Sequence, residues 1–130
     1  MERVLGVGGI FIRFEDREAL SRWYRDNLGL PVDEAWWGAA LPLKTDRERA
    51  GAAVVWGSFA DSAYFGRDDQ VFMVNFRVHD LDAMLKQLRE SGCDVLDKVE
   101  ANDFGRFGWV TDPEGNRVEL WQPPDTALQG

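Results

Sequence analysis

The sequence predicts an α+β domain in which two tandem β-α-β-β-β units form one curved mixed sheet around a cleft, with the helices on the outer face. Three observations lead to this fold class. A strand and helix recur at a constant offset of 64 residues, a strand-turn-strand motif closes the chain, and 45% of the 130 residues are hydrophobic. That apolar content suits one compact domain with a single core.

The repeat places residues 9–16 over residues 73–80. In both copies an apolar row faces one side of a strand, and an Asp follows at the position that caps a helix. The helix-facing rows are Ile10, Ile12 and Phe14, then Val74, Phe76 and Val78. We therefore expect one unit at about 7–60, a connection at about 61–70, a second unit at about 71–123 and a tail at 124–130.

Apolar residues at helical spacing predict one helix at each repeat. The first runs over about 17–28 and is ended by Gly29, and the second runs over about 81–91 and is ended by Gly92. The buried stripes are Leu20, Trp23, Tyr24 and Leu28, then Leu81, Met84, Leu85 and Leu88.

Strands are expected near 31–34, 36–42 and 52–59 in the first unit, and at 94–99, 107–111 and 117–122 in the second. The charged stretch 44–50 is predicted to be a loop. Pro113 and Gly115 favour a tight turn over 112–116 between the last two strands. Beyond that turn the side chains alternate, so one face carries Arg117, Glu119 and Trp121 and the other carries Val118 and Leu120.

Composition excludes several classes of partner. The net charge is −8 and the pI is about 4.6, which argues against nucleic acid. No apolar run reaches the ~18 residues of a membrane helix and the N-terminus is unlike a secretory signal, so we expect a cytoplasmic protein without a membrane partner. Cys93 is the single cysteine, which rules out an intrachain disulfide and is expected to be at least partly buried.

The opening at 9–29 and the ending at 112–120 resemble the vicinal oxygen chelate superfamily. That superfamily contains glyoxalase I, extradiol dioxygenases, fosfomycin-resistance enzymes and bleomycin-binding proteins. The resemblance covers residues 7–123. It implies the glyoxalase/bleomycin resistance fold and a homodimer, with each cleft either within one chain or shared between two.

In metal-using members the resemblance implies four cleft-facing ligands, one His or Gln, one His and two Glu. The corresponding first and third positions here are Gly9 and Met73, strand 52–59 has no ligand side chain, and Glu119 alone remains. Because transition-metal sites need about three protein ligands, we expect no metal and no other cofactor. A Mg²⁺ site using Glu119, Asn75 and waters is the alternative.

The rows opposite the helices should line the cleft. Arg13 and Arg77 are predicted to bind a carboxylate or phosphate, and Trp109 or Trp121 to stack on a ring. Alternatively, Glu119 pairs with one of the arginines and only balances a buried charge. The predicted ligand-binding residues are Phe11, Arg13, Trp37, Met73, Asn75, Arg77, Trp109, Arg117 and Trp121, and Glu119 is the candidate catalytic residue.

Two functions fit these residues. The first is a metal-independent protein that sequesters or carries a small aromatic or planar molecule, as the bleomycin-resistance branch does. The second is an enzyme, a lyase, isomerase or dioxygenase, that uses Glu119 as a general base or as an atypical metal ligand. A nearby arginine would lower the pKa of Glu119 and weaken its action as a base. A third class, a protein-interaction module, stays open.

Overall fold

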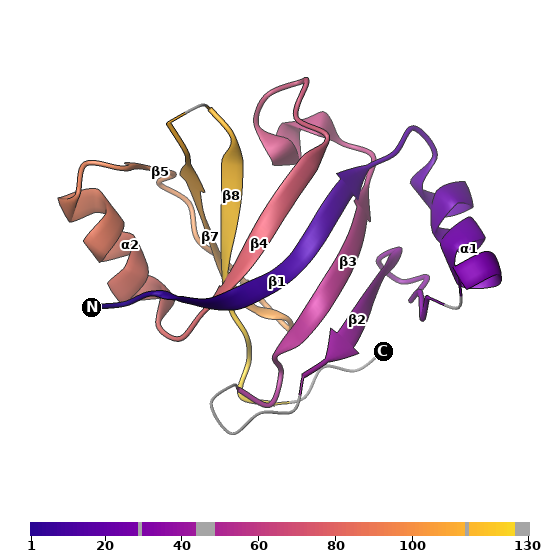
Figure 1. Cartoon of the computed structure of the whole chain (residues 1–130), viewed down its shortest axis with the longest axis horizontal. Coiled ribbons are helices and arrows are strands. Elements are labelled where there is room, and N and C mark those ends of the chain that lie inside the picture. The colour runs from indigo at the N-terminus through magenta and orange to yellow at the C-terminus, as the bar shows by residue number, and fades with distance from the viewer. Residues whose placement is uncertain (29, 44–48, 114, 127–130) are drawn as a thin grey trace.

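The computed structural model describes residues 1–28, 30–43, 49–113 and 115–126 (Figure 1). The first unit contains β1 (Val4–Arg13), α1 (Arg17–Leu28), β2 (Gly38–Pro42) and β3 (Ala53–Phe59). A short 3-10 helix, η1 (Ser62–Phe65), lies in the connection. The second unit contains β4 (Phe72–Val78), α2 (Leu81–Glu90), β5 (Asp94–Val95), β6 (Glu100–Asn102), β7 (Gly105–Thr111) and β8 (Arg117–Gln122).

The strands form one mixed sheet in the order β2-β3-β1-β4-β8-β7-β5, with β6 paired to β7. β1 and β4 pair antiparallel at the centre and join the two units. On each side the central strand pairs parallel with the next one, β1 with β3 and β4 with β8. The two halves of the sheet therefore repeat one arrangement, and the predicted fold class is confirmed.

Both helices begin where the repeat predicts. Asp16 Oδ1 accepts a hydrogen bond from Ala19 N at 3.1 Å, and Asp80 Oδ1 accepts one from Ala83 N at 3.0 Å. These caps satisfy amides that have no partner within the helix. α2 ends one residue earlier than expected, before Gly92 at φ 79°. Gly29 and the side chains of Trp23 and Leu28 lie outside the described part of the chain.

Two of the predicted strands are wrong or too long. The segment at 31–34 makes only an isolated bridge between Asp33 and Gly38, because the Asp33 carboxylate turns the chain by accepting from Ala35 N at 2.8 Å. The strand expected at 94–99 is reduced to β5, and β6 was not predicted. Of the charged loop, residues 44–48 lie outside the described residues.

The turn between the last two strands forms as its residues predict. Gly115 has φ 88°, and its amide donates to the Asp112 carbonyl at 2.9 Å. The Asn116 amide donates to Asp112 Oδ1 at 2.8 Å. β8 leaves this turn with Leu120 on the helix side and Glu119 on the other, as the alternation requires.

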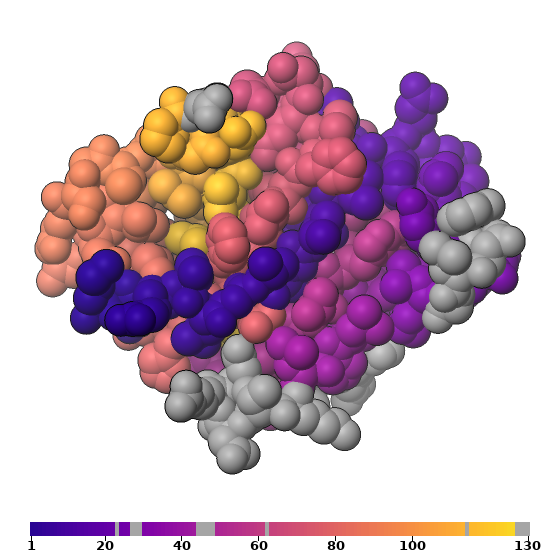
Figure 2. Space-filling model, viewed as in Figure 1, coloured from indigo at the N-terminus to yellow at the C-terminus, as the bar shows by residue number. Residues whose placement is uncertain are grey.

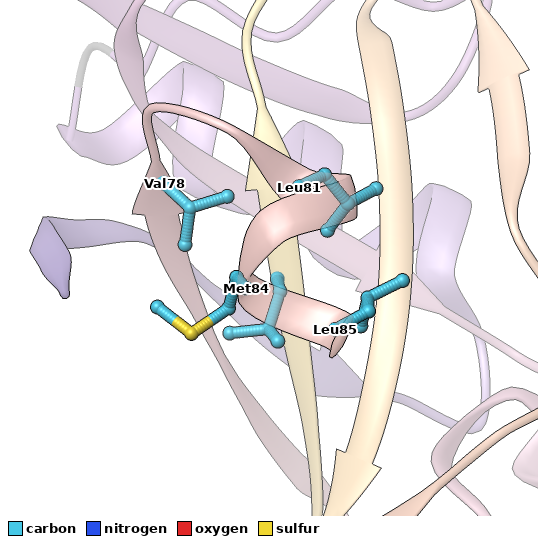
Figure 3. Close-up of a cluster of buried hydrophobic side chains, with 5 residues drawn as sticks. Val78, Leu81, Met84 and Leu85 are labelled. Carbon is cyan, nitrogen blue, oxygen red and sulfur yellow. The ribbon is translucent and has the colours of Figure 1, made fainter. Parts of the chain in front are cut away.

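The main apolar core lies between α2 and the sheet (Figure 3). The stripe at helical spacing on α2 packs against the outer face of β4 and β8. The buried residues of this core are Leu81, Met84 and Leu85 on α2, Val78 on β4 and Leu120 on β8. A second buried cluster lies on the inner face, and it consists of Phe11, Phe65, Met73 and Trp109.

The predicted helix-facing rows are only partly covered. Phe76 and Val78 pack with α2, and Phe14 stacks near Tyr24 of α1 at 6.1 Å between ring centroids. Ile10 and Val74 are exposed instead. The reason is that α1 packs over β3, whereas α2 packs over β5, β7 and β8 and meets β4 at Phe76 and Val78.

Two further observations concern the surface. Cys93 is exposed, which corrects the expectation of a buried thiol, because it follows the end of α2 on the outside of the sheet. Neither helix in the described part of the chain has the length and apolar character needed to cross a membrane.

Leu85→Ala should lower the free energy of unfolding by about 2–5 kcal/mol, because the cavity would lie between α2 and the sheet. Lys86→Ala on the exposed side of the same helix should change it by less than about 0.5 kcal/mol. Urea denaturation of both variants measures the difference. Equal effects would contradict the placement of this core.

Candidate functional site

The inner face of the sheet holds a cleft of about 330 Å³. Half of the residues in its wall are aromatic, and they come from both units and from the connection, namely Phe11, Trp36, Phe59, Tyr64, Phe104, Phe107 and Trp121. Ala35, Val55 and Gly57 add apolar surface, and the polar side chains are Arg17, Ser58, Asn75 and Glu119.

Glu119 lies in the wall of this cleft and is fully buried, with 0% of its surface exposed. Its Oε2 accepts from Asn75 Nδ2 at 2.6 Å. Its Oε1 accepts from Trp109 Nε1 at 3.1 Å and from the Tyr64 hydroxyl. Strand register brings these groups together, because Asn75 on β4 and Trp109 on β7 are the direct neighbours of Glu119 on β8.

The environment of Glu119 moves its titration close to neutrality. Burial raises the pKa of Glu119 to about 7, and the three hydrogen bonds oppose this rise without cancelling it. Burial, together with the charge of Glu119, raises the pKa of Tyr64 far above its usual value of 10. Tyr64 therefore remains a neutral donor at any physiological pH, while Glu119 changes its charge.

Tyr64 is held in place by η1. The Asp61 side chain accepts from Ala63 N at 2.8 Å and caps this short helix. Arg117 Nη1 donates to the carbonyls of Ala63 and Tyr64 at 3.3 and 3.1 Å. The Tyr64 ring stacks on Phe59 at 4.8 Å. Sequence analysis missed Tyr64 because it lies in the connection, where no periodicity or repeat marks it.

Trp36 lies in the cleft wall in place of its neighbour Trp37, which was the predicted ligand-binding residue. Trp36 lines the cleft and contacts Phe104 edge-on at 5.2 Å. Trp37 packs against α1, where Arg22 Cζ lies 4.7 Å from the ring centroid. The backbone of Trp37 has φ 56°, and β2 begins only at Gly38. The assumption of an extended strand through both residues therefore assigned the wrong ring to the cleft.

The buried backbone at Trp37 is held by two hydroxyl groups. Its carbonyl accepts from Ser58 Oγ at 2.5 Å and from Ser21 Oγ at 3.2 Å. The two hydroxyls lie 2.8 Å apart. This link between α1 and β3 fixes the unusual conformation that directs Trp36 into the cleft.

The arginines expected in the cleft lie elsewhere. Arg13 Nη2 donates to the Asp68 carbonyl at 2.6 Å, Arg77 donates to the Val7 carbonyl beside Gly6, and Arg117 holds η1. None of the three is part of the cleft wall. Their guanidinium groups extend to backbone carbonyls. The alternation of side chains along a strand does not predict where the end of such a long side chain binds. In the described residues, the hydrogen-bond partners of Glu119 are neutral groups rather than an arginine.

Four predicted site residues do line the cleft, namely Phe11, Asn75, Glu119 and Trp121. Met73 and Trp109 lie beneath it in the inner cluster, and Trp109 reaches Glu119 through its indole N–H. Trp121 Nε1 donates to the Phe104 carbonyl at 2.6 Å, and its ring lies parallel to Phe107 at 6.1 Å. Phe104 and Phe107 were not among the predicted ligand-binding residues.

The donor set does not fit a divalent transition metal. Register aligns Val55, Gly9, Asn75 and Glu119 across four strands, and both Glu119 oxygens already accept hydrogen bonds. A side chain at Gly8 would meet Asn75 Oδ1 at 2.0 Å. The described residues contain no group of three His, Cys, Asp or Glu side chains that could hold an ion. Metal-independent action itself stays a prediction.

Comparison with known families identifies the group to which the protein belongs. The glyoxalase-like domain family matches residues 9–121. The chain belongs to this family. The glyoxalase-like protein is thus a member of the vicinal oxygen chelate superfamily, as the opening and ending motifs indicate.

Solved structures share its fold at low sequence identity. A methylmalonyl-CoA epimerase in complex with methylmalonyl-CoA and NH4+ is 21% identical, with a TM-score of 0.66 over 98% of this chain and 100% of that one. The Mycobacterium tuberculosis methylmalonyl-CoA epimerase is 21% identical, with a TM-score of 0.59 over 93% and 89%. A glyoxalase/bleomycin resistance protein/dioxygenase superfamily member from Vibrio splendidus 12B01 is 15% identical, with a TM-score of 0.55 over 94% and 99%. No curated protein matches the chain.

The raised pKa of Glu119 predicts a pH-dependent stability. Between pH 4.5, the ordinary pKa, and about pH 7 the unfolded chain releases this proton while the folded chain keeps it. The free energy of unfolding should therefore fall as pH rises through this window, by about 3 kcal/mol. Glu119→Gln should lack this component, so the difference between wild type and variant, measured by urea denaturation, isolates it. A difference that is constant from pH 4.5 to 7 would contradict the burial of Glu119.

Proposed function

We propose that the glyoxalase-like protein binds a planar aromatic small molecule in the cleft of each chain, without a metal, and sequesters or carries it. The observation that carries this proposal is the combination of aromatic walls with one buried carboxyl group. The cleft volume of about 330 Å³ lies within the range that suits small ligands, roughly 300–1,000 Å³.

The walls favour a flat apolar ligand. Trp36 and Phe104 come from loops, whereas Phe107 and Trp121 stand on neighbouring strands with parallel rings. A planar ring that lies against such groups gains stacking contacts worth about 0.5–1.5 kcal/mol for each aromatic pair, beyond the burial of its apolar area. Because strands and packed rings hold most of this wall, little ordering is needed when a ligand binds.

Polar groups in the wall indicate what the ligand carries. A carboxylate offers about four acceptor positions, and three donors of the protein occupy Glu119. The remaining position suits an N–H or O–H donor of the ligand. In the described structure the buried Trp36 Nε1 has no hydrogen-bond partner. Since an unsatisfied buried donor costs about 1–3 kcal/mol, an acceptor on the ligand would recover free energy there.

The positions of the arginines also bear on the charge of the ligand. Because Arg13, Arg77 and Arg117 bind backbone carbonyls outside the cleft wall, they do not offset Glu119 there. Arg17 is the one cationic residue of the wall. A neutral or cationic ring system with a donor toward Glu119 therefore suits the cleft better than an anion.

Tryptophan fluorescence tests the proposal with two probes of equal ring number. Lumichrome carries N–H donors and carbonyl acceptors, and anthracene-2-carboxylate is an anion. We expect lumichrome to quench the protein saturably and to bind at least about tenfold more tightly, or 1.4 kcal/mol. Trp36→Phe should weaken lumichrome binding, whereas Trp56→Phe, which changes a ring packed with Tyr24 outside the cleft, should not. Absence of saturable binding by either probe would refute the binding function, and tighter binding of the anion would refute the role of Glu119.

A second candidate function is proton transfer by Glu119, and its raised pKa is the observation that favours it. When the pKa of a base lies near the working pH, a large fraction of the base is in its charged form. That form still binds the abstracted proton strongly enough to drive the transfer. Among the described residues no arginine holds the carboxylate in its charged form, so the objection raised by the sequence is removed. Proteins named methylmalonyl-CoA epimerase share the fold, and an isomerase of this kind would need such a group.

Exchange of the substrate proton tests this second candidate. If Glu119 acts as a base on an acyl thioester of this type, methylmalonyl-CoA incubated with the protein in D2O should gain deuterium at the carbon between its two carbonyl groups. Mass spectrometry measures the gain. Glu119→Gln should lower the rate to that of the buffer alone, because the amide cannot accept the proton. An equal rate for wild type, variant and buffer would exclude base catalysis on this substrate.

A further inference from the structure

Two hydrogen-bond donors in the cleft wall lack an acceptor in the described structure. One is the buried indole N–H of Trp36. The other is the guanidinium of Arg17, which lines the same cleft, is half-buried and makes no hydrogen bond or ion pair with a described residue. Because an unsatisfied donor shielded from water raises the free energy of the protein, an acceptor on a ligand would be stabilised at both groups.

The lack of a partner for Arg17 does not come from a shortage of acids. The chain has 23 acidic and 15 basic side chains, and Asp16 and Glu18 flank Arg17 in the sequence. The Asp16 carboxylate instead accepts from Ala19 N and caps α1. Further along the same helix, Arg25 pairs with Glu34 at 2.9 Å. Among the described residues, Arg17 thus keeps its N–H groups free beside the cleft.

We propose that Arg17, together with the Trp36 N–H, binds a carboxylate on a substituent of the ring system that the cleft accepts. This inference rests on the proposed function, because it describes the second polar end of the same ligand. The ring that meets Glu119 stays neutral, and the acidic group lies apart from it. The ligand class is therefore an aromatic acid that carries an N–H or O–H donor on its ring.

The positions of the two polar ends agree with such a ligand. Register places Glu119 level with Asn75, and Asn75 level with Gly9 on β1. β1 continues from Gly9 to Arg13, a span of about 13 Å of extended strand, and α1 begins beyond it at Arg17. The segment that joins β1 to α1 lies at the margin of the molecule in Figures 1 and 2. Arg17 therefore belongs to the outer part of the cleft, and Glu119 to its floor.

This separation keeps the ligand carboxylate away from the charge of Glu119. A carboxylate beside half-buried Arg17 also retains part of its hydration, so it loses less solvation free energy than it would on the cleft floor. Repulsion between charges that are this far apart and partly exposed is screened over a Debye length of about 8–10 Å. A ligand can thus be acidic at the outer end and a neutral donor at the inner end.

The donors suit a carboxylate better than a phosphate. The planar guanidinium of Arg17 can donate two parallel hydrogen bonds to the two oxygens of a carboxylate, and the Trp36 indole can add a third. Phosphate carries nearly two negative charges at neutral pH. Arg17 is the one cationic residue among those that line the cleft, and the net charge of the chain is −8. The second charge of a phosphate would therefore lack a cation.

Two probes of nearly the same shape test the proposal by isothermal titration calorimetry. Indole-3-propionate and indole-3-propionamide share the ring, its N–H and the side chain, and only the first is an anion. We expect wild type to bind the propionate at least about tenfold more tightly than the amide at low salt. In Arg17→Met, which keeps the length of the side chain and removes the charge, this preference should fall below about twofold.

Three controls accompany this comparison. Arg89→Met removes the same charge from an exposed position on α2, outside the cleft wall, and should keep the preference of wild type. Arg17→Met should bind the amide as wild type does, which shows that its cleft is intact. Trp36→Phe keeps an aromatic ring without the N–H and should weaken binding of the propionate at least about threefold.

The outcomes separate this inference from the proposed function. Equal affinity of wild type for both probes, or a preference for the propionate that persists in Arg17→Met, would overturn the role of Arg17 and leave binding in the cleft intact. Unchanged binding of the propionate by Trp36→Phe would overturn the role of the indole N–H. Failure of wild type to bind either probe would contradict the proposed function and this inference with it.

Discussion

The antiparallel pairing of β1 with β4 is the contact on which the rest of the structure depends. It joins two units that repeat one another in sequence and turns their two half-sheets into one curved sheet. Because side chains alternate along a strand, the same register sets Phe11 and Asn75 on the inner face and Ile10 and Val74 on the outer face. The cleft and the exposed apolar face of β1 and β4 are thus two sides of one strand pair.

Within the cleft, the burial of Glu119 sets the chemistry. A buried carboxylate raises the free energy of the folded state unless its oxygens accept hydrogen bonds. Three neutral donors from β4, β7 and η1 supply these bonds to Glu119. Neutral donors stabilise the charge less than an arginine or a metal ion would. The outcome is a carboxyl group whose pKa lies near 7 rather than well below its usual range. Both proposed functions, ligand binding and proton transfer, rest on this group.

Asn75 shows how the site departs from a chelating one. Its amide nitrogen donates to Glu119, and its oxygen occupies the space that a side chain at position 8 would need. At Gly9, the ligand position that the resemblance implies, an added Cβ would instead meet the Val55 carbonyl oxygen at 2.3 Å. Gly8 and Asn75 therefore form a matched pair, in which the missing side chain of one makes room for the amide of the other.

The sequence by itself determined the two-unit fold, the ranges of both helices, the final turn and the placement of Phe11, Asn75, Glu119 and Trp121 in the cleft. Periodicity, capping and turn residues act over a few positions, so they can be read along the chain. Only the tertiary structure decided where the arginines reach, which tryptophan enters the cleft and that Tyr64 joins Glu119. A long side chain can bind any carbonyl within its reach, and one left-handed residue at Trp37 changes which ring faces inward. A loop such as η1 has no period, so its contacts depend on the folded chain around it.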